Sequence, residues 1–406
     1  MRCIRRRIHG DASPCLTSAG AVLQSAPLRG MLPFSRSIAC LLAGLLLMTV
    51  ALAMMNTMVP LWLSEAGVAT STAGYVGALF FCGTLAGTVS AGRLIRLFGF
   101  NGCYQAACML CAFSSAGLLL GLDGCSWGAL RFLSGVSSAW IWVVVESALL
   151  RAGSVKSRGS LLAAYMMVYY VGTVLGQLAL GVLDDEMAVM VPGVCVLCVA
   201  GMIPLFVARM PEAEDAEAGV RVALGPLLRR RSAMLGVAGC AISGVVLGTL
   251  YTLMPVFLAH KGMSVPDVGY WMALLIGAGV AGQWPLGRLA DGYGRGLVLR
   301  GLSVMIAAAC MGLLGGDWLL APSFVVLGAA GFSLYPIAMA WGCSDAARDE
   351  LVVMNQLLLL SFSVGSLAGP AVTSSLMQCF SDDWMPLALA LAACLYLPVL
   401  QVRRSK

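Results

Sequence analysis

The sequence predicts an all-α membrane protein with twelve transmembrane helices, arranged as two pseudo-symmetric six-helix bundles. Three observations predict it. Apolar residues make up 60% of the chain and charged residues 11%, with a mean hydropathy of +0.91, whereas a soluble domain is about a quarter charged. The apolar residues fall into twelve long runs. A segment from the first half of the chain also recurs in the second half.

Each run is long enough to cross the hydrocarbon core of a bilayer, which takes about 20 mostly apolar residues in a helix. The runs are continuous and do not alternate apolar with polar residues, so they favour helices over a transmembrane β-barrel. The predicted spans are 38–60, 71–91, 102–121, 127–150, 161–182, 189–208, 233–258, 268–287, 298–315, 319–341, 353–376 and 385–402.

The cations between the spans predict the orientation. With the N-terminus inside, the inner loops carry nearly all the Lys and Arg, and Lys261 is the one cation in the outer loops. Cytoplasmic loops are enriched in Lys and Arg, so we predict that both termini are cytoplasmic. The net charge of +6 is then a topology signal, and it does not indicate nucleic-acid binding.

The first thirty residues are rich in Arg and show no apolar periodicity. We interpret 1–30 as a disordered cytoplasmic tail, or as an extension ahead of a true start at Met31. An Arg-rich transit peptide is the alternative.

The internal repeat predicts how the chain is divided. Residues 56–101 align with 251–296 at an offset of 195 residues without a gap, and 14 of the 46 positions are identical, including Pro60 with Pro255. The offset spans six helices, so the halves share one orientation, which defines a parallel repeat. We predict bundles at 31–208 and 233–406, joined by a cytoplasmic linker at 209–232. Two such bundles suit transport by alternating access.

One loop carries a specific resemblance. Gly287-Arg-Leu-Ala-Asp291-Gly-Tyr-Gly294-Arg295 resembles the motif G-x-L-a-D-r-x-G-r of the major facilitator superfamily, and it lies between the second and third spans of its half. Other segments are similar to that superfamily and to its YcaD-type bacterial inner-membrane branch: Arg131-Phe-Leu-Ser-Gly135, Asn56 to Trp62, Trp140 to Ser147, Ala163 to Gly172 and Gly282 to Gly287.

The resemblance implies the major facilitator fold and a secondary active transporter, proton-coupled or facilitated, in a bacterial inner membrane. The implied partners are the lipid bilayer, a small-molecule substrate and protons, and we expect a monomer. The alternatives are a membrane sensor with a transporter fold, or a lipid-acting enzyme. An enzyme would need clustered acids or His at one membrane face, which the sequence lacks, so we do not expect enzymatic activity.

Neither a cofactor nor a metal is predicted. No phosphate loop of the G-x-x-x-x-G-K-[ST] type occurs, which argues against ATP. Cys108-x-x-Cys111 and Cys195-x-x-Cys198 have the spacing of metal ligands. Both pairs lie inside apolar runs, however, where Cys packs as a small apolar residue.

The loop motif predicts a gate. Gly287 and Gly294 permit a tight reversal, and Asp291 can accept hydrogen bonds from a helix N-terminus or pair with an Arg. Such a contact would hold one transport state closed. The alternative is a topology signal in which Arg288 and Arg295 only keep the loop inside. The first-half copy of the motif has Arg96 at the position that Asp291 occupies in the second-half copy.

Two ionisable residues lie within the fourth span. Arg131 and Glu146 are 15 residues apart, roughly 22 Å along a helix. An intramembrane charge is a functional candidate, because its desolvation must be offset. Arg131 could bind an anionic group or bias a proton site, or it could snorkel to the outer headgroups. Glu146 could carry a proton, or it could form an interfacial pair with Arg151 or Arg158.

Other polar residues within or near the spans could line the path, although bundles also use such groups to join helices. These candidates are Asn56, Thr57, Tyr75, Tyr165, Tyr169, Gln177, Tyr251, Gln283, Tyr335, Asn355 and Gln356. The spacings Gly172 to Gly176 and Gly365 to Gly369 predict close helix packing.

Overall fold

The computed structural model describes residues 36–120, 123–152, 158–183, 186–207, 230–346 and 350–401. Within these ranges the chain is helical and contains no strand. The α-helices are α1 (Arg36–Glu65), α2 (Thr70–Gly117), α3 (Gly124–Ala152), α4 (Arg158–Ala179), α5 (Met187–Val207), α7 (Arg231–His260), α8 (Val265–Tyr293), α9 (Arg295–Leu313), α10 (Leu320–Gly342), α11 (Leu351–Cys379) and α12 (Trp384–Gln401).

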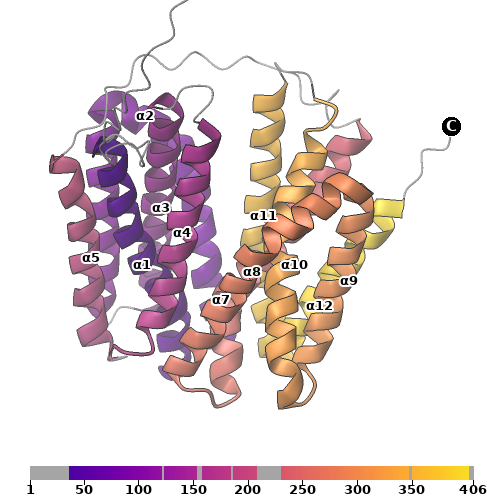
Figure 1. Cartoon of the computed structure of the whole chain (residues 1–406). Coiled ribbons are helices and arrows are strands. Elements are labelled where there is room, and N and C mark those ends of the chain that lie inside the picture. Colours follow the sequence, from indigo (N-terminus) through magenta and orange to yellow (C-terminus); the bar gives the residue numbers. More distant parts are fainter. Residues whose placement is uncertain are drawn as a thin grey trace, which may run out of the picture. The chain divides into compact units, whose positions relative to one another are not determined.

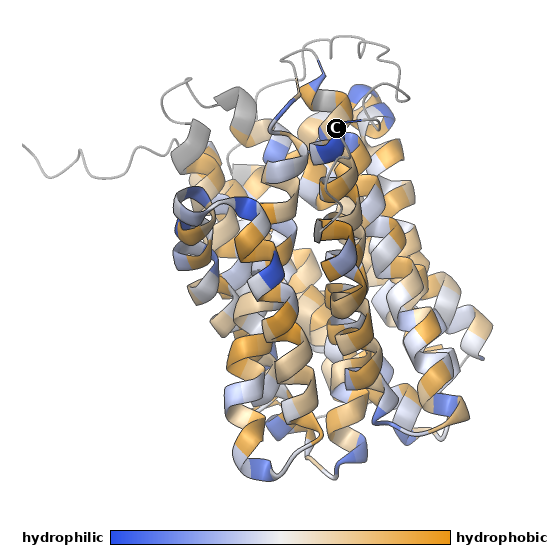
Figure 2. Ribbon diagram, turned by 90° about the vertical axis from the view of Figure 1, so that its right-hand side faces the viewer, coloured by the Kyte–Doolittle hydropathy of each residue, from blue (hydrophilic) through white to orange (hydrophobic). Residues whose placement is uncertain are grey.

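The helices match the predicted spans. In the described residues, ten helices are long and apolar enough to cross a membrane, and α12 adds the shorter apolar stretch Trp384–Leu400. Helix α2 has 48 residues, about 72 Å of rise, which is enough for two crossings. The all-helical fold class is therefore confirmed, and twelve crossings fit these lengths. Figure 2 shows hydrophobic residues along the middle of the helices and many of the hydrophilic ones toward their two ends.

The break predicted at 92–101 is shorter than expected. Helical geometry continues through the first copy of the loop motif, and only Gly99 leaves it, with φ 68° and ψ 178°. A left-handed φ is accessible to glycine at little cost. One residue is therefore enough to separate the two helices that together form α2.

The internal repeat reappears in the backbone. Positive φ values occur at Gly67 and Gly99 in the first half, and at Gly262 and Gly294 in the second. Both pairs are 195 residues apart, the offset found in the sequence. Helices α1 and α7 end at this offset, and α2 and α8 begin at it. The aligned residues thus form equivalent turns, as expected for a duplicated unit.

Helices α1–α5 form one group and α7–α12 a second (Figure 1). We call residues 36–207 the N-terminal half and residues 230–401 the C-terminal half. The tail 1–30 and most of the linker 209–232 lie outside the described residues, so the predicted domain boundaries stay predictions.

Glycine spacing explains how helices approach within each half. A Cβ atom at Gly176 would lie 2.6 Å from the carbonyl oxygen of Val50, so α4 packs directly on α1. A Cβ atom at Gly369 would lie 2.6 Å from the carbonyl oxygen of Val245, so α11 packs on α7 in the same way. The close packing predicted from the small-residue spacing is confirmed.

The two halves meet at one end in particular. We call it the closed end and define it by the last residues of α1 and α7, Glu65 and His260. Several hydrogen bonds between the halves lie there. They join Ser64 Oγ to His260 Nε2 (2.9 Å), the Thr70 amide to Gln378 Oε1 (2.8 Å) and Tyr75 to Ser375 (3.2 Å between hydroxyls).

Candidate transport site

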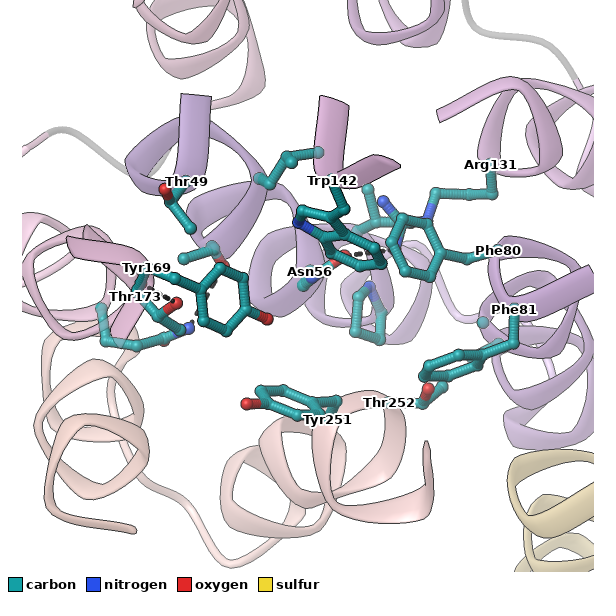
Figure 3. A pocket seen from close by; sticks show the side chains of 17 residues that line it. Thr49, Asn56, Phe80, Phe81, Arg131, Trp142, Tyr169, Thr173, Tyr251 and Thr252 are labelled. Carbon is teal, nitrogen blue, oxygen red and sulfur yellow. Dashed lines mark hydrogen bonds between the residues drawn. The ribbon is translucent and has the colours of Figure 1, made fainter. Parts of the chain in front are cut away.

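A cavity of about 80 Å³ lies between α1, α2, α3, α4 and α7, and residues of both halves line it. Its wall is mostly apolar and aromatic (Figure 3). The lining residues are Thr49, Leu52, Ala53, Asn56, Val59, Pro60, Ala73, Gly77, Phe80, Phe81, Arg131, Trp142, Tyr169, Thr173, Gln177, Tyr251 and Thr252. A partly polar cavity at the meeting of two related bundles is where transporters of this layout bind their substrates.

Arg131 is the charged residue of this wall. Its side chain is 5% exposed, so it does not snorkel to a headgroup region. Nη2 donates a hydrogen bond to Asn56 Oδ1 at 2.7 Å, and the guanidinium lies over the Phe80 ring, 4.6 Å from its centroid. Nε and Nη1 are buried and have no hydrogen-bond partner. Among the described residues no carboxylate forms an ion pair with Arg131.

Gln177 binds α4 to α1 beside this charge. Its Nε2 donates to the carbonyl oxygen of Ala53 at 3.1 Å, and its Oε1 accepts from Thr57 Oγ1 at 2.9 Å. Both ends of the amide are therefore occupied. Thr57 is buried behind the wall and does not line the cavity.

Aromatic rings continue from the cavity across the junction of the halves. Tyr169 contacts Trp142 and Tyr170 edge to face. Tyr170 contacts Phe332 of α10, which in turn contacts Tyr251 of α7. Edge-to-face pairs of this kind stabilise by about 0.5–1.5 kcal/mol beyond the burial of their area. The rings thus join both halves beside the cavity.

Gln283 strengthens that junction, since its Nε2 donates to the Tyr170 hydroxyl at 2.9 Å. Gln283 is one of the candidates for the path, and in this conformation it joins α8 to α4. The same holds for Tyr75, which hydrogen-bonds Ser375 at the closed end.

Glu146 lies toward the other end of α3, on an exposed face. Its carboxylate is within electrostatic reach of the hydroxyls of Tyr165 on α4 and Tyr335 on α10. These two tyrosines belong to different halves, so Glu146 faces the space between them. The side chains of Arg151 and Arg158 lie outside the described residues, and the predicted interfacial pair stays a prediction.

The loop motif between α8 and α9 is largely exposed. Arg288 lies over the Trp284 ring, 4.5 Å from its centroid, and Arg295 donates to the carbonyl oxygen of Ala340 at 2.8 Å. Asp291 is exposed, and within the described residues it has neither an ion pair nor a side-chain hydrogen bond. The described residues show no partner for it, and the gating role stays a prediction.

The candidates separate into two groups. Asn56, Arg131, Tyr169, Gln177 and Tyr251 meet at the cavity. Tyr335 packs on Phe362 instead, with ring centroids 4.7 Å apart, and Asn355 and Gln356 are exposed near the start of α11.

Sequence reasoning missed several residues of the wall, notably Trp142, Phe80, Phe81 and Thr252. Trp142 and its neighbours in the Trp140 to Ser147 run offered the one usable signal, because that segment carries the family resemblance.

The cysteine pairs of α2 and α5 face each other inside the N-terminal half. Cys111 and Cys198 are both buried, and Cys195 Sγ donates to the carbonyl oxygen of Ala112 at 3.4 Å. In the part of the chain that the structure describes, no group of three or more potential ligands could hold a metal ion.

These features define a class: a multi-pass helical membrane protein with a largely apolar, singly charged cavity where two related helix groups meet. The comparisons with known proteins agree. The sequence model of the Major Facilitator Superfamily matches residues 41–370. An MFS-type transporter of Yersinia pestis (strain Pestoides F) is 50% identical over 370 residues, covering 91% of this chain and 96% of that protein. The MFS-type transporter YcaD of Escherichia coli O139:H28 is 47% identical over the same shares.

Two solved structures show the same fold at low sequence identity. The nucleoside transporter NupG superimposes with a TM-score of 0.74 at 11% identity, covering 91% of this chain and 100% of that one. A bacterial homolog of the human lysosomal transporter Spinster, inward-facing and occupied, gives a TM-score of 0.68 at 15% identity, covering 89% and 92%. The chain belongs to the major facilitator superfamily, and it is a membrane transporter.

Proposed function

We propose that this transporter moves a small solute by alternating access, coupled to protons, across a bacterial inner membrane with both termini in the cytoplasm. The observation that carries the proposal is the cavity, which residues of both halves line. Rocking of two related bundles about such a site exposes it to each side in turn.

The hydrogen bonds between the halves support an assignment of the present state. Several of them lie at the closed end, and the distribution of Lys and Arg favours an outer location for this end. A transporter sealed on the outside is inward-facing. Asp291 is exposed in this state, as expected if its partner is engaged only when the inner side closes.

Glu146 is the candidate for proton coupling. It is the acid within the fourth span, and it faces the space between the halves near Tyr165 and Tyr335. In an inward-facing state a carboxylate there can exchange a proton with the cytoplasm. Glu146→Gln mimics its protonated form, so accumulation driven by a pH gradient should fail while exchange of solute persists.

The test uses purified protein in vesicles, with a panel of isotope-labelled organic acids, amines, sugars and nucleosides and a pH-sensitive dye trapped inside. We expect at least one compound to accumulate under a pH gradient and to move protons. Glu146→Gln should retain exchange of that compound and lose its accumulation. Asp317→Asn is the matched control, because Asp317 is an exposed acid on the opposite half.

The outcomes separate the readings. Accumulation at the wild-type level in Glu146→Gln would remove the coupling role and leave transport intact. Movement of no compound in either direction, with intact protein, would contradict transport and favour a sensor.

A further inference from the structure

We propose that the cavity binds a small organic monoanion, whose carboxylate is held by Arg131 and whose apolar body packs against the aromatic wall. This inference rests on the proposed function and assigns the substrate class of the same site.

The charge of the cavity carries the first step. Of its lining residues, Arg131 is the one that is charged at neutral pH, and the wall contains no Asp, Glu, Lys or His. Taking a guanidinium out of water is costly unless an opposite charge is near. The hydrogen bond to the neutral amide of Asn56 does not supply that charge. A bound anion would, and a positively charged solute would be repelled.

The unused hydrogen-bonding groups carry the second step. Arg131 Nε and Nη1 are buried and have no partner, and both are donors. The nearby amide oxygens are already occupied, since Asn56 accepts from Arg131 and Gln177 accepts from Thr57. Buried donors normally find acceptors. The wall offers these donors no negatively charged acceptor, and a carboxylate brings acceptors with the matching charge.

The shape of the wall carries the third step. Phe80 covers one face of the guanidinium, so a ligand approaches in the guanidinium plane, where the N–H groups point. Trp142, Tyr169 and Tyr251 surround the remaining space with rings (Figure 3). The cavity of about 80 Å³ has room for roughly five waters. These dimensions fit a short-chain or single-ring acid with one negative charge.

Binding in detergent tests the inference without requiring transport. A ligand that binds the folded protein raises its thermal unfolding temperature. The probes are butyrate, phenylacetate and benzoate, with benzamide and benzylamine as a neutral and a cationic counterpart of benzoate. We expect at least one carboxylate to stabilise the wild-type protein, and neither counterpart to do so.

Variants assign the effect to the site. Arg131→Gln should weaken carboxylate binding on the order of 10- to 100-fold, as expected for loss of a charge-assisted contact. Arg131→Lys keeps the charge and loses the planar fork, so it should weaken binding by a smaller factor and serves if Arg131→Gln fails to fold. Arg96→Gln is the matched control, because it removes an exposed cation outside the cavity.

Three results would overturn the inference: stabilisation by benzamide or benzylamine equal to that by benzoate, no stabilisation by any carboxylate, or wild-type affinity in both cavity variants. Carboxylate binding without flux in vesicles would leave the inference standing and contradict the proposed function. Flux of neutral or cationic solutes alone would support the proposed function and contradict the inference that the substrate is an anion.

Discussion

Removing the His260 side chain should loosen the closed end and populate the outward-facing state. His260, the last residue of α7, is hydrogen-bonded through Nε2 to Ser64 of the other half and through Nδ1 to Asp382 of its own half, both at 2.9 Å. Of these two contacts of His260, only the one with Ser64 joins the halves. The pair with Asp382 orients the ring, and its side chains are 32% and 41% exposed, so its direct contribution is small.

The expected magnitude follows from that single bond. A hydrogen bond contributes about 0.5–1.5 kcal/mol net, and partial exposure favours the lower part of this range. A loss of about 0.5–1 kcal/mol changes the ratio of the two states by roughly twofold to fivefold. His260→Ala and Ser64→Ala should each have this effect. The double variant should not exceed it, because both changes remove the same contact.

Native cysteines allow the measurement. Cys125 at the start of α3 and Cys379 at the end of α11 are exposed and belong to different halves. Spin labels on these two thiols, with Cys3, Cys15 and Cys394 changed to Ser, report their separation by double electron–electron resonance. The longer distance should gain population in both variants. Ser126→Ala is the control, since Ser126 bonds within one half at Asp123. An unchanged distribution in both variants would refute the reasoning.

Two further predictions concern the gate and the packing. Asp291→Asn should lower flux, because it removes the acid of the proposed gate. The amount of inserted protein should stay constant, because the loop keeps Arg288 and Arg295. Membrane yield and vesicle flux check this, and unchanged flux would leave only the topology role. Gly176→Leu should destabilise the protein by roughly 1–3 kcal/mol, because its Cβ would lie 2.6 Å from the carbonyl oxygen of Val50. Gly193→Leu is the control, because Gly193 has open space around it. The first variant should unfold at a lower temperature than the second in detergent, and equal unfolding temperatures would contradict the packing argument.

The sequence was sufficient to predict the helices and the repeat, because both depend on composition and spacing along the chain. It also identified Asn56, Arg131, Tyr169, Gln177 and Tyr251, since polar groups within apolar helices need a partner or a cavity. It could not separate them from Asn355 and Gln356, which are exposed near the start of α11.

The aromatic wall was beyond the reach of pattern reading. Phe80, Phe81 and Trp142 lie on helices that are apolar all round, so periodicity does not distinguish a cavity-facing ring from a lipid-facing one. Which face a ring presents is decided by the packing of distant helices. Thr252 illustrates the point, because it reaches the cavity from α7 of the other half. Its side chain fills the space that a Cβ atom at Gly77 on α2 would occupy.

The closed end has one more property, which concerns how tightly the two halves can seal. A Cβ atom at Gly74 would overlap Ser374 Oγ and lie 2.8 Å from the carbonyl oxygen of Pro370 on α11, and one at Gly269 would lie 2.5 Å from the carbonyl oxygen of Gln177 on α4. These glycines are equivalent in the repeat, so the halves touch through main chain at two related places. Main chain has no rotamers with which to adapt, so a larger residue at either place would hold the helices apart. These two glycines therefore set how closely the halves can approach at the end that seals the cavity.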